Sequence, residues 1–257
     1  NSFTMNYELK PSSYENAGAK WVLQEVNLFD GHTGDGVDNL VTRFVYEDPY
    51  FDRRERDFYG YGKVSQQQIN STDNTVYTTA VQEYYNTDYF RKNLLKTNYV
   101  LDAANNKMEQ SFVEYAIINA QDNTLLNEAI LSLPTSDALR IFIAPVHTIE
   151  HLYEGSSYLE KNTFMEYDAK GNVVKYIDNG NGTTNDKLTA VISYHTSTAP
   201  YYDGIAKQIE VFTSEGLKRK RVTSINPSTA EVTQFKMYIS ADKVAVTDIE
   251  YDTDGNL

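Results

Sequence analysis

The chain has 257 residues and a formal net charge of −13 at pH 7. This acidic balance disfavours nucleic acid as a partner, because phosphate binding depends on clustered Lys and Arg. The sequence holds no cysteine, which excludes disulfides, thiol nucleophiles and Cys-ligated zinc. It also holds no run of about 18 apolar residues, so it predicts no membrane-spanning helix.

The N-terminal third predicts a hairpin with a long tip. Residues 21–28 and 40–46 have strand-like patterns, and the turn-rich segment 30–36 lies between them. Three aspartates crowd this region and are candidates for calcium binding: Asp30, Asp35 and Asp38. An Asp-rich turn without a metal explains the same residues.

A compact block, residues 48–64, combines aromatic, charged and glycine residues. Its sequence is Asp-Pro-Tyr-Phe-Asp-Arg-Arg-Glu-Arg-Asp-Phe-Tyr-Gly-Tyr-Gly-Lys-Val. Glu55 and Arg56, with their charged neighbours, could belong to a catalytic carboxylate cluster, but such matched charges more often form ion pairs that position a turn. Gly60 and Gly62 are too few for a phosphate-binding loop and indicate backbone positions where a Cβ atom would clash.

Residues 123–133 carry the chain's clearest helical pattern. Five apolar residues there would share one face of a helix: Leu125, Leu126, Ala129, Ile130 and Leu133. Pro134 would end that helix. The sequence therefore predicts one short helix near 123–133 in a chain otherwise made of strands.

Residues 147–151 match an H-x-x-E-H zinc motif by letters. The motif needs a helix that holds His147 and His151 on one ion, with Glu150 as the base. The preceding run 139–143 favours a strand instead, and Pro145 lies just ahead of the motif. We therefore expect both histidines to be structural. Apart from the calcium candidates Asp30, Asp35 and Asp38, we predict no metal site, and we predict no cofactor and no catalytic residue.

The second half of the chain is dominated by period-two alternation, as in residues 188–195 and 208–213, which predicts half-buried antiparallel strands. Two turns repeat one motif: Tyr167-Asp168-Ala169-Lys170-Gly171-Asn172 and Tyr251-Asp252-Thr253-Asp254-Gly255-Asn256. The Asp accepts backbone N–H groups ahead of it, and the Gly supplies the left-handed conformation that closes a hairpin. A weaker copy begins at Asp102. The basic cluster 218–221 lies inside an alternating stretch, which indicates strand charges rather than a polyanion site.

These blocks resemble a known superfamily. The Tyr-Asp…Gly-Asn turns resemble the YD repeat of RHS and teneurin proteins. The block 48–64 resembles the signature just ahead of the repeats in the B component of insecticidal Tc toxins and SpvB/TcdB-like proteins. Asp57 replaces the more usual glutamate there, and Tyr61 the usual phenylalanine. The residues that the resemblance marks as structural are Tyr50, Asp52, Glu55, Arg56, Phe58, Gly60, Gly62, Tyr167, Asp168, Gly171, Asn172, Tyr251, Asp252, Gly255 and Asn256.

The resemblance implies an all-β fold in which consecutive antiparallel hairpins form a strip of a hollow shell. Residues 1–150 would be a Tc-B middle-like region and residues 151–257 a YD-repeat region of one continuous fragment. The sequence ends directly after a turn, which also leads us to expect a fragment of a longer protein. The partners implied are the remainder of that chain and an enclosed C-terminal polypeptide.

The function implied is a non-catalytic structural module of a secreted or cell-surface bacterial protein. Fold alone does not fix function. A cell-surface adhesin or glycan-binding module remains the alternative, because the chain has 21 tyrosines and glycan-binding surfaces use this residue. A hydrolase is the third possibility, and the H-x-x-E-H letters are its main support.

Overall fold

The computed structural model describes residues 2–11, 18–31, 39–132, 140–182, 186–240, 243–252 and 255–256. Within these residues the chain forms fifteen strands and one short 3-10 helix. The first eight elements are β1 Ser2–Pro11, β2 Ala19–Phe29, β3 Asn39–Asp52, β4 Asp57–Ile69, β5 Val76–Tyr85, β6 Leu94–Asp102, β7 Lys107–Asn119 and η1 Glu128–Ser132. The remaining strands are β8 Ile141–Glu154, β9 Ser157–Tyr167, β10 Val173–Asp178, β11 Leu188–Thr198, β12 Tyr201–Thr213, β13 Gly216–Ile225, β14 Val232–Ser240 and β15 Lys243–Asp248.

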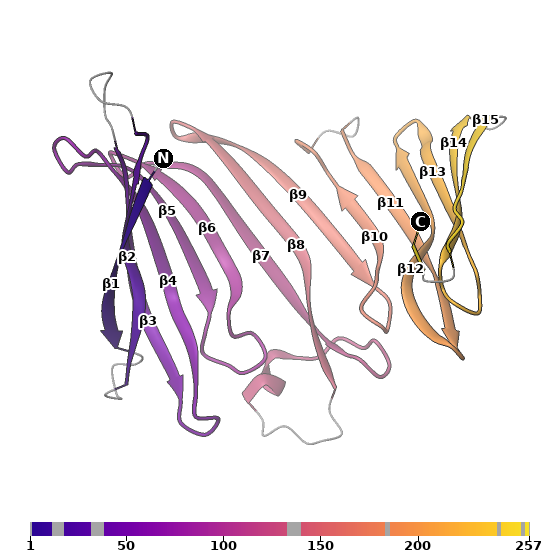
Figure 1. Ribbon diagram of the computed structural model, residues 1–257, viewed down its shortest axis with the longest axis horizontal. Coiled ribbons are helices and arrows are strands. Elements are labelled where there is room, and N and C mark those ends of the chain that lie inside the picture. The colour runs from indigo at the N-terminus through magenta and orange to yellow at the C-terminus, as the bar shows by residue number, and fades with distance from the viewer. Residues whose placement is uncertain are drawn as a thin grey trace.

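All fifteen strands belong to one sheet, and each pairs antiparallel with the next strand along the chain. Figure 1 shows the sheet as a curved strip, in which the strands at its two ends are seen nearly edge-on. Turns therefore alternate between the long edges of the strip. Those after odd-numbered strands lie along one edge, at the bottom of Figure 1, which we call the lower edge. Those after even-numbered strands lie along the upper edge.

The all-β prediction of consecutive antiparallel hairpins is confirmed. Predicted strands 21–28 and 40–46 lie within β2 and β3, and the H-x-x-E-H residues lie within β8. Among the described residues no helix is long and apolar enough to cross a membrane.

The helix predicted near 123–133 is much shorter than its pattern suggested, since only Glu128–Ser132 is helical. Leu125 instead forms a β-bridge with Ile118, and the Leu126 N–H donates to the Ile117 carbonyl at 2.8 Å. A helix needs a second layer to cover its apolar stripe, and Leu125 is 76% exposed here. The expected end of the helix, Leu133 and Pro134, lies outside the described residues.

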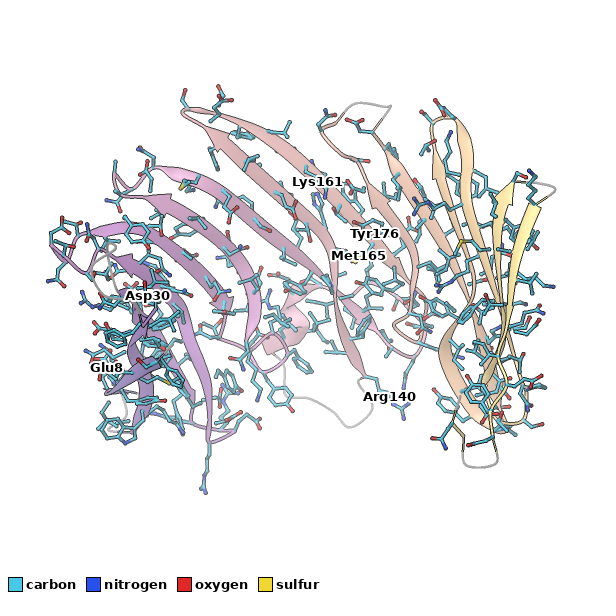
Figure 2. All side chains as sticks on the ribbon, turned by 45° about the horizontal axis from the view of Figure 1, so that its top comes forward. Glu8, Asp30, Arg140, Lys161, Met165 and Tyr176 are labelled. Atoms are coloured by element: carbon cyan, nitrogen blue, oxygen red, sulfur yellow. The ribbon has the colours of Figure 1, made fainter. Side chains whose placement is uncertain are left out.

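The strip is a single layer, and Figure 2 shows side chains leaving both of its faces. Few apolar residues of the described part are buried: Val41, Tyr59, Ile69, Val81, Ile117, Ile118 and Ala144. A two-layer domain of this length would enclose a larger core. The strip therefore depends on its backbone ladders, on cross-strand pairs and on contacts between neighbouring hairpins.

Candidate structural site: ties along the lower edge

Backbone pairing stops short of the lower edge in every second strand pair. These are the pairs joined at the upper edge, from β2–β3 to β14–β15. Their last backbone pairs toward the lower edge are Glu25–Arg43, Lys63–Glu83, Thr97–Phe112, His147–Phe164, Lys175–Val191, Gln208–Val222 and Gln234–Asp248. Below these points successive lower-edge hairpins separate, and carbonyl groups lose their ladder partners. We call each such opening a gap and name it by its two strands.

Tyrosine hydroxyls bridge four of these gaps. Each hydroxyl donates to a backbone carbonyl of the preceding strand: Tyr46 to Leu23 at 2.9 Å, Tyr115 to Leu95 at 2.9 Å, Tyr167 to Pro145 at 2.8 Å and Tyr194 to Val173 at 2.7 Å. All four occupy one structural position. The tyrosine lies three residues after the last paired residue of its strand, and the acceptor lies two residues before that residue's partner. We call these contacts tyrosine ties.

The surroundings of the ties favour the neutral phenol. Desolvation by burial raises the pKa of Tyr46, Tyr115, Tyr167 and Tyr194 above the ordinary tyrosine value. For Tyr194 the nearby Asp168 carboxylate adds to this effect. A neutral hydroxyl is the form that can donate to a carbonyl, so each tie is intact at neutral pH.

The remaining three gaps differ from this arrangement, and in two of them another residue holds the tyrosine position. Asn86 holds the equivalent position in the β4–β5 gap, and its Nδ2 donates to the Asp48 carbonyl at 2.7 Å. Ile225 holds it in the β12–β13 gap, and beside this gap His195 Nε2 of β11 donates to the Thr223 carbonyl of β13 at 2.7 Å. Tyr251 holds it in the β14–β15 gap. The YD tyrosines Tyr167 and Tyr251 are thus two instances of a position that the strip repeats.

Ion pairs join neighbouring turns along the same edge. Lys92 in the β5–β6 turn contacts Asp57 of β4 at 2.6 Å, and Arg91 contacts Glu128 of η1 at 2.9 Å. Lys170 in the β9–β10 turn contacts Asp203 of β12 at 2.5 Å.

Hydrogen bonds supplement these ion pairs. Asn123 Nδ2 donates to the Tyr167 carbonyl at 3.2 Å, and Asn172 Nδ2 donates to Asp203 at 3.1 Å. The bond from Lys92 lowers the pKa of Asp57, and the bond from Lys170 lowers that of Asp203. The lower edge is therefore cross-linked from β4 to β12.

The Tyr-Asp…Gly-Asn turn at residues 167–172 has the predicted geometry. Asp168 Oδ1 accepts the backbone N–H groups of Lys170 and Asn172, both at 2.9 Å, and Gly171 has a φ of 87°. The Gly171 N–H closes the turn on the Asp168 carbonyl at 3.1 Å. This is a three-residue hairpin loop in which a type I turn is followed by a left-handed residue.

Two further turns share these hydrogen bonds of the Asp and the left-handed residue ahead of the final Asn. Asp252 accepts the Asn256 N–H at 2.8 Å, and Gly255 has a φ of 81°. The turn at Asp102 is the same, with Asn105 at a φ of 63° in place of the glycine. Asn is the non-glycine residue that tolerates this conformation best, which explains why the motif at Asp102 looks weaker in sequence.

The block 48–64 forms the β3–β4 hairpin at the lower edge. Asp52 Oδ1 accepts the backbone N–H groups of Arg54 and Glu55 at 2.8 and 3.0 Å, so a backbone contact shapes this turn. Within the described residues Glu55 and Arg56 form no ion pair, and both are exposed. These observations do not support a catalytic carboxylate cluster in this hairpin.

The rest of the block packs tightly against the next turn. Tyr59 is 1% exposed, its ring lies beside Tyr50 and the Lys92 ammonium lies 4.9 Å from its centroid. Phe58 packs edge-on against Tyr61. A Cβ atom on Gly60, which has a φ of 95°, would lie 2.8 Å from Asn93 Oδ1.

Gly62 is the second close approach in the block. A Cβ atom there would lie 3.0 Å from Asp48 Cβ and 3.1 Å from Asn86 Nδ2. These glycines therefore let the β5–β6 turn approach the backbone of β4, as their spacing predicted.

The metal candidates divide by where they fall. Asp35 and Asp38 lie outside the described residues, so calcium binding with Asp30 stays a prediction. No group of three or more potential ligands forms among the residues that the structure does describe.

The two histidines of the zinc-like motif face different partners on strand β8. His147 contacts Glu114 at 3.0 Å and Asn162 at 2.7 Å, whereas His151 contacts Glu160 at 3.0 Å. Four residues of extended strand separate them by about 13 Å, which is too far for one ion.

The sequence pattern missed most of the tie residues. Tyr46, Tyr115, Tyr194 and His195 lack the Asp that marks a YD turn, and Asn86 is not aromatic. The high tyrosine content was the available signal, but the repeat position appears only once the strand register is known. Of the four tie tyrosines, only Tyr167 is therefore among the residues that the family resemblance marks as structural.

The comparisons with known proteins agree with this architecture. Residues 15–98 match the family model for the insecticide toxin TcdB middle/N-terminal region. No curated protein matches the sequence. Among solved structures, TcdB2-TccC3-Cdc42 shares 11% identity and a TM-score of 0.63, over 91% of this chain and 17% of that chain.

A second solved structure, a Photorhabdus luminescens Tc holotoxin pore with a mutation in TccC3, shares 12% identity with a TM-score of 0.59. It covers 85% of this chain and 16% of that one. The chain thus spans less than a fifth of these relatives, and at such identity the likeness shows the fold. By sequence over residues 15–98 and by fold over most of its length, this chain resembles the B component of Tc toxins.

Proposed function

We propose that this chain is a non-catalytic wall segment of an exported, Tc-toxin-like protein, and that the wall encloses a C-terminal polypeptide. The observation that carries this proposal is the single-layer strip, in which both faces are open and only scattered residues are buried. A wall needs two accessible faces, one toward its contents and one toward solvent. An enzyme needs a site that excludes water around converging groups.

The lower-edge ties support a mechanical role. Curvature in a strip depends on how neighbouring hairpins are set relative to one another, and each gap is where two hairpins diverge. Tyrosine ties such as Tyr167 to Pro145, and ion pairs such as Lys170 to Asp203, hold neighbouring hairpins at a set separation across each gap. In this proposal the structural motif residues maintain the shape of the wall. The division at residue 150 and the secreted location belong to the same proposal.

The test uses the longer protein that carries this sequence. Limited proteolysis should spare a C-terminal polypeptide in the assembled particle and degrade it after the particle is opened with denaturant. Equal degradation in both states would contradict the wall proposal. A variant with Tyr167→Phe and Tyr194→Phe should lose protection at lower denaturant concentrations than the wild type.

The glycan-binding alternative gains little from the structure. The four tie tyrosines turn their hydroxyls to backbone carbonyls, which explains part of the tyrosine content without a ligand. A glycan array with the 257-residue chain tests this alternative directly. Saturable binding to one sugar class would favour the adhesin reading.

A further inference from the structure

A shallow hollow lies on one face of strands β6 to β9. It has a volume of about 420 Å³, at the small end of the range for ligand sites in proteins. Two rows of paired residues form it, since antiparallel partners point to the same face. One row is Glu109, Leu152 and Leu159, and the next is Asn98, Ser111, Glu150 and Lys161.

The hollow lies where one short side chain, Ser111, stands among longer ones. Leu152 and Leu159 stand beside it with 61% and 53% of their surfaces exposed, so they form an apolar wall that nothing in the described part of the chain covers. Isolated exposed leucines are common, whereas these two are directly paired at the rim of the hollow.

Glu109 is the carboxylate of the hollow that lacks a cation, whereas Glu150 shares the Lys161 ammonium with Asp178. Glu109 forms no ion pair with any described residue. Glu150 is 3.9 Å from Lys161, but the Lys161 ammonium lies closer to Asp178, at 3.3 Å, and hydrogen bonding to Asp178 raises its pKa. Figure 2 labels Lys161 on its strand. Glu109 and Glu150 stand on diagonal positions of adjacent strands, so their charges repel each other at neutral pH.

We propose that this hollow binds a lysine or arginine side chain presented by an extended polypeptide segment. The long aliphatic stem of such a residue would lie along Leu152 and Leu159, and its charged end would lie between Glu109 and Glu150. Basic side chains combine an apolar stem and a cationic tip in this order. The wall proposal supplies such a segment, namely the enclosed C-terminal polypeptide. The inference rests on the wall proposal only for the identity of this polypeptide.

The experiment uses the 257-residue chain and a fluorescein-labelled peptide of about twelve residues. The peptide carries two central Leu-Lys pairs in a Gly-Ser background, and a control peptide has Gln in place of each Lys. Fluorescence anisotropy is measured at about 50 mM salt and again at about 500 mM, where exposed charges are screened. We expect the Lys peptide to bind at least tenfold more tightly than the Gln peptide, with most of the difference lost at high salt.

Variants locate the site. Glu109→Gln with Glu150→Gln should weaken the Lys peptide at least tenfold, whereas Glu250→Gln, which removes one charge from an exposed position after β15, should not. Leu152→Ser should weaken both peptides. Circular dichroism melting checks that each variant is folded.

Equal binding of the two peptides, or equal binding by the double variant and the wild type, would overturn the inference. Failure here would leave the wall proposal standing, because the proteolysis test does not depend on this hollow.

Discussion

Removing one hydroxyl from Tyr167 isolates a single tyrosine tie. Tyr167→Phe keeps the ring against Phe142 and deletes the 2.8 Å bond to the Pro145 carbonyl, together with a weaker 3.6 Å contact from the hydroxyl to Met165 Sδ. A hydrogen bond of this kind contributes about 0.5–1.5 kcal/mol net. The site is part-buried, so water compensates the carbonyl incompletely. We therefore expect Tyr167→Phe to lower the free energy of unfolding by about 1 kcal/mol.

The other ties and a matched control sharpen this prediction. Tyr46→Phe, Tyr115→Phe and Tyr194→Phe should each cost a similar amount, and because the ties lie in separate gaps their effects should add to about 4 kcal/mol. Tyr201 is 77% exposed and makes no hydrogen bond through its hydroxyl in the described structure, so Tyr201→Phe should change stability by less than about 0.5 kcal/mol. The summed loss of about 4 kcal/mol for the four tie variants is a large part of the free energy of unfolding of a typical folded domain, about 5–15 kcal/mol.

The assay is urea unfolding followed by far-ultraviolet circular dichroism, with midpoint and slope fitted for each variant. A lower midpoint at unchanged slope is the expected result for the four tie variants. The reasoning would be refuted if the tie variants unfold at the wild-type midpoint, or if Tyr201→Phe loses as much stability as they do.

Three further predictions concern other parts of the lower edge. Burial raises the pKa of Tyr59 to about 12. The neutral phenol therefore contributes stability below about pH 10, and this contribution is lost as the pH rises toward 12. Tyr59→Phe should remove the last step of the phenolate absorbance titration. Gly60→Ala should lower the free energy of unfolding in urea by about 2 kcal/mol, because it adds the clash with Asn93 to the strain of a positive φ. Gly155 also has a positive φ, 61°, but open space around it, so Gly155→Ala should cost about 1 kcal/mol. Equal losses for the two variants would exclude the clash. The bond from Lys170 lowers the pKa of Asp203, so this ion pair contributes to folding stability above about pH 4 and the contribution is lost as the pH falls below that. The difference in melting temperature between wild type and Asp203→Asn should therefore shrink toward zero in acid. A difference that stays constant with pH would contradict the ion pair.

The strands and the YD turns could be predicted because both are local. Period-two alternation predicted antiparallel strands, and the spacing of Asp and Gly at Asp168 and Asp252 predicted the geometry of the turns. The prediction for residues 123–133 was too long because an apolar stripe stabilises a helix only against a second layer, which this strip lacks.

The ties could not be predicted because they depend on register between strands. Tyr46 and Leu23 are 23 residues apart in sequence, and nothing local marks the point where their strands separate. The same holds for Asn86 at the β4–β5 gap, whose amide reaches past β4 to the Asp48 carbonyl of β3. The ion-pair expectation for Glu55 and Arg56 rested on charge alone, whereas the turn is shaped by Asp52 and backbone N–H groups. Local chemistry gives the elements, and contacts between distant strands give the shape.

The most direct test of the wall proposal is a cryo-electron microscopy map of the longer, Tc-toxin-like protein that this proposal requires. The account predicts that residues of this strip form a single layer of density with a hollow on one side and solvent on the other. Density for a second sheet or a layer of helices packed across the face of β6 to β9 would contradict it, because the strip would then be half of a closed domain.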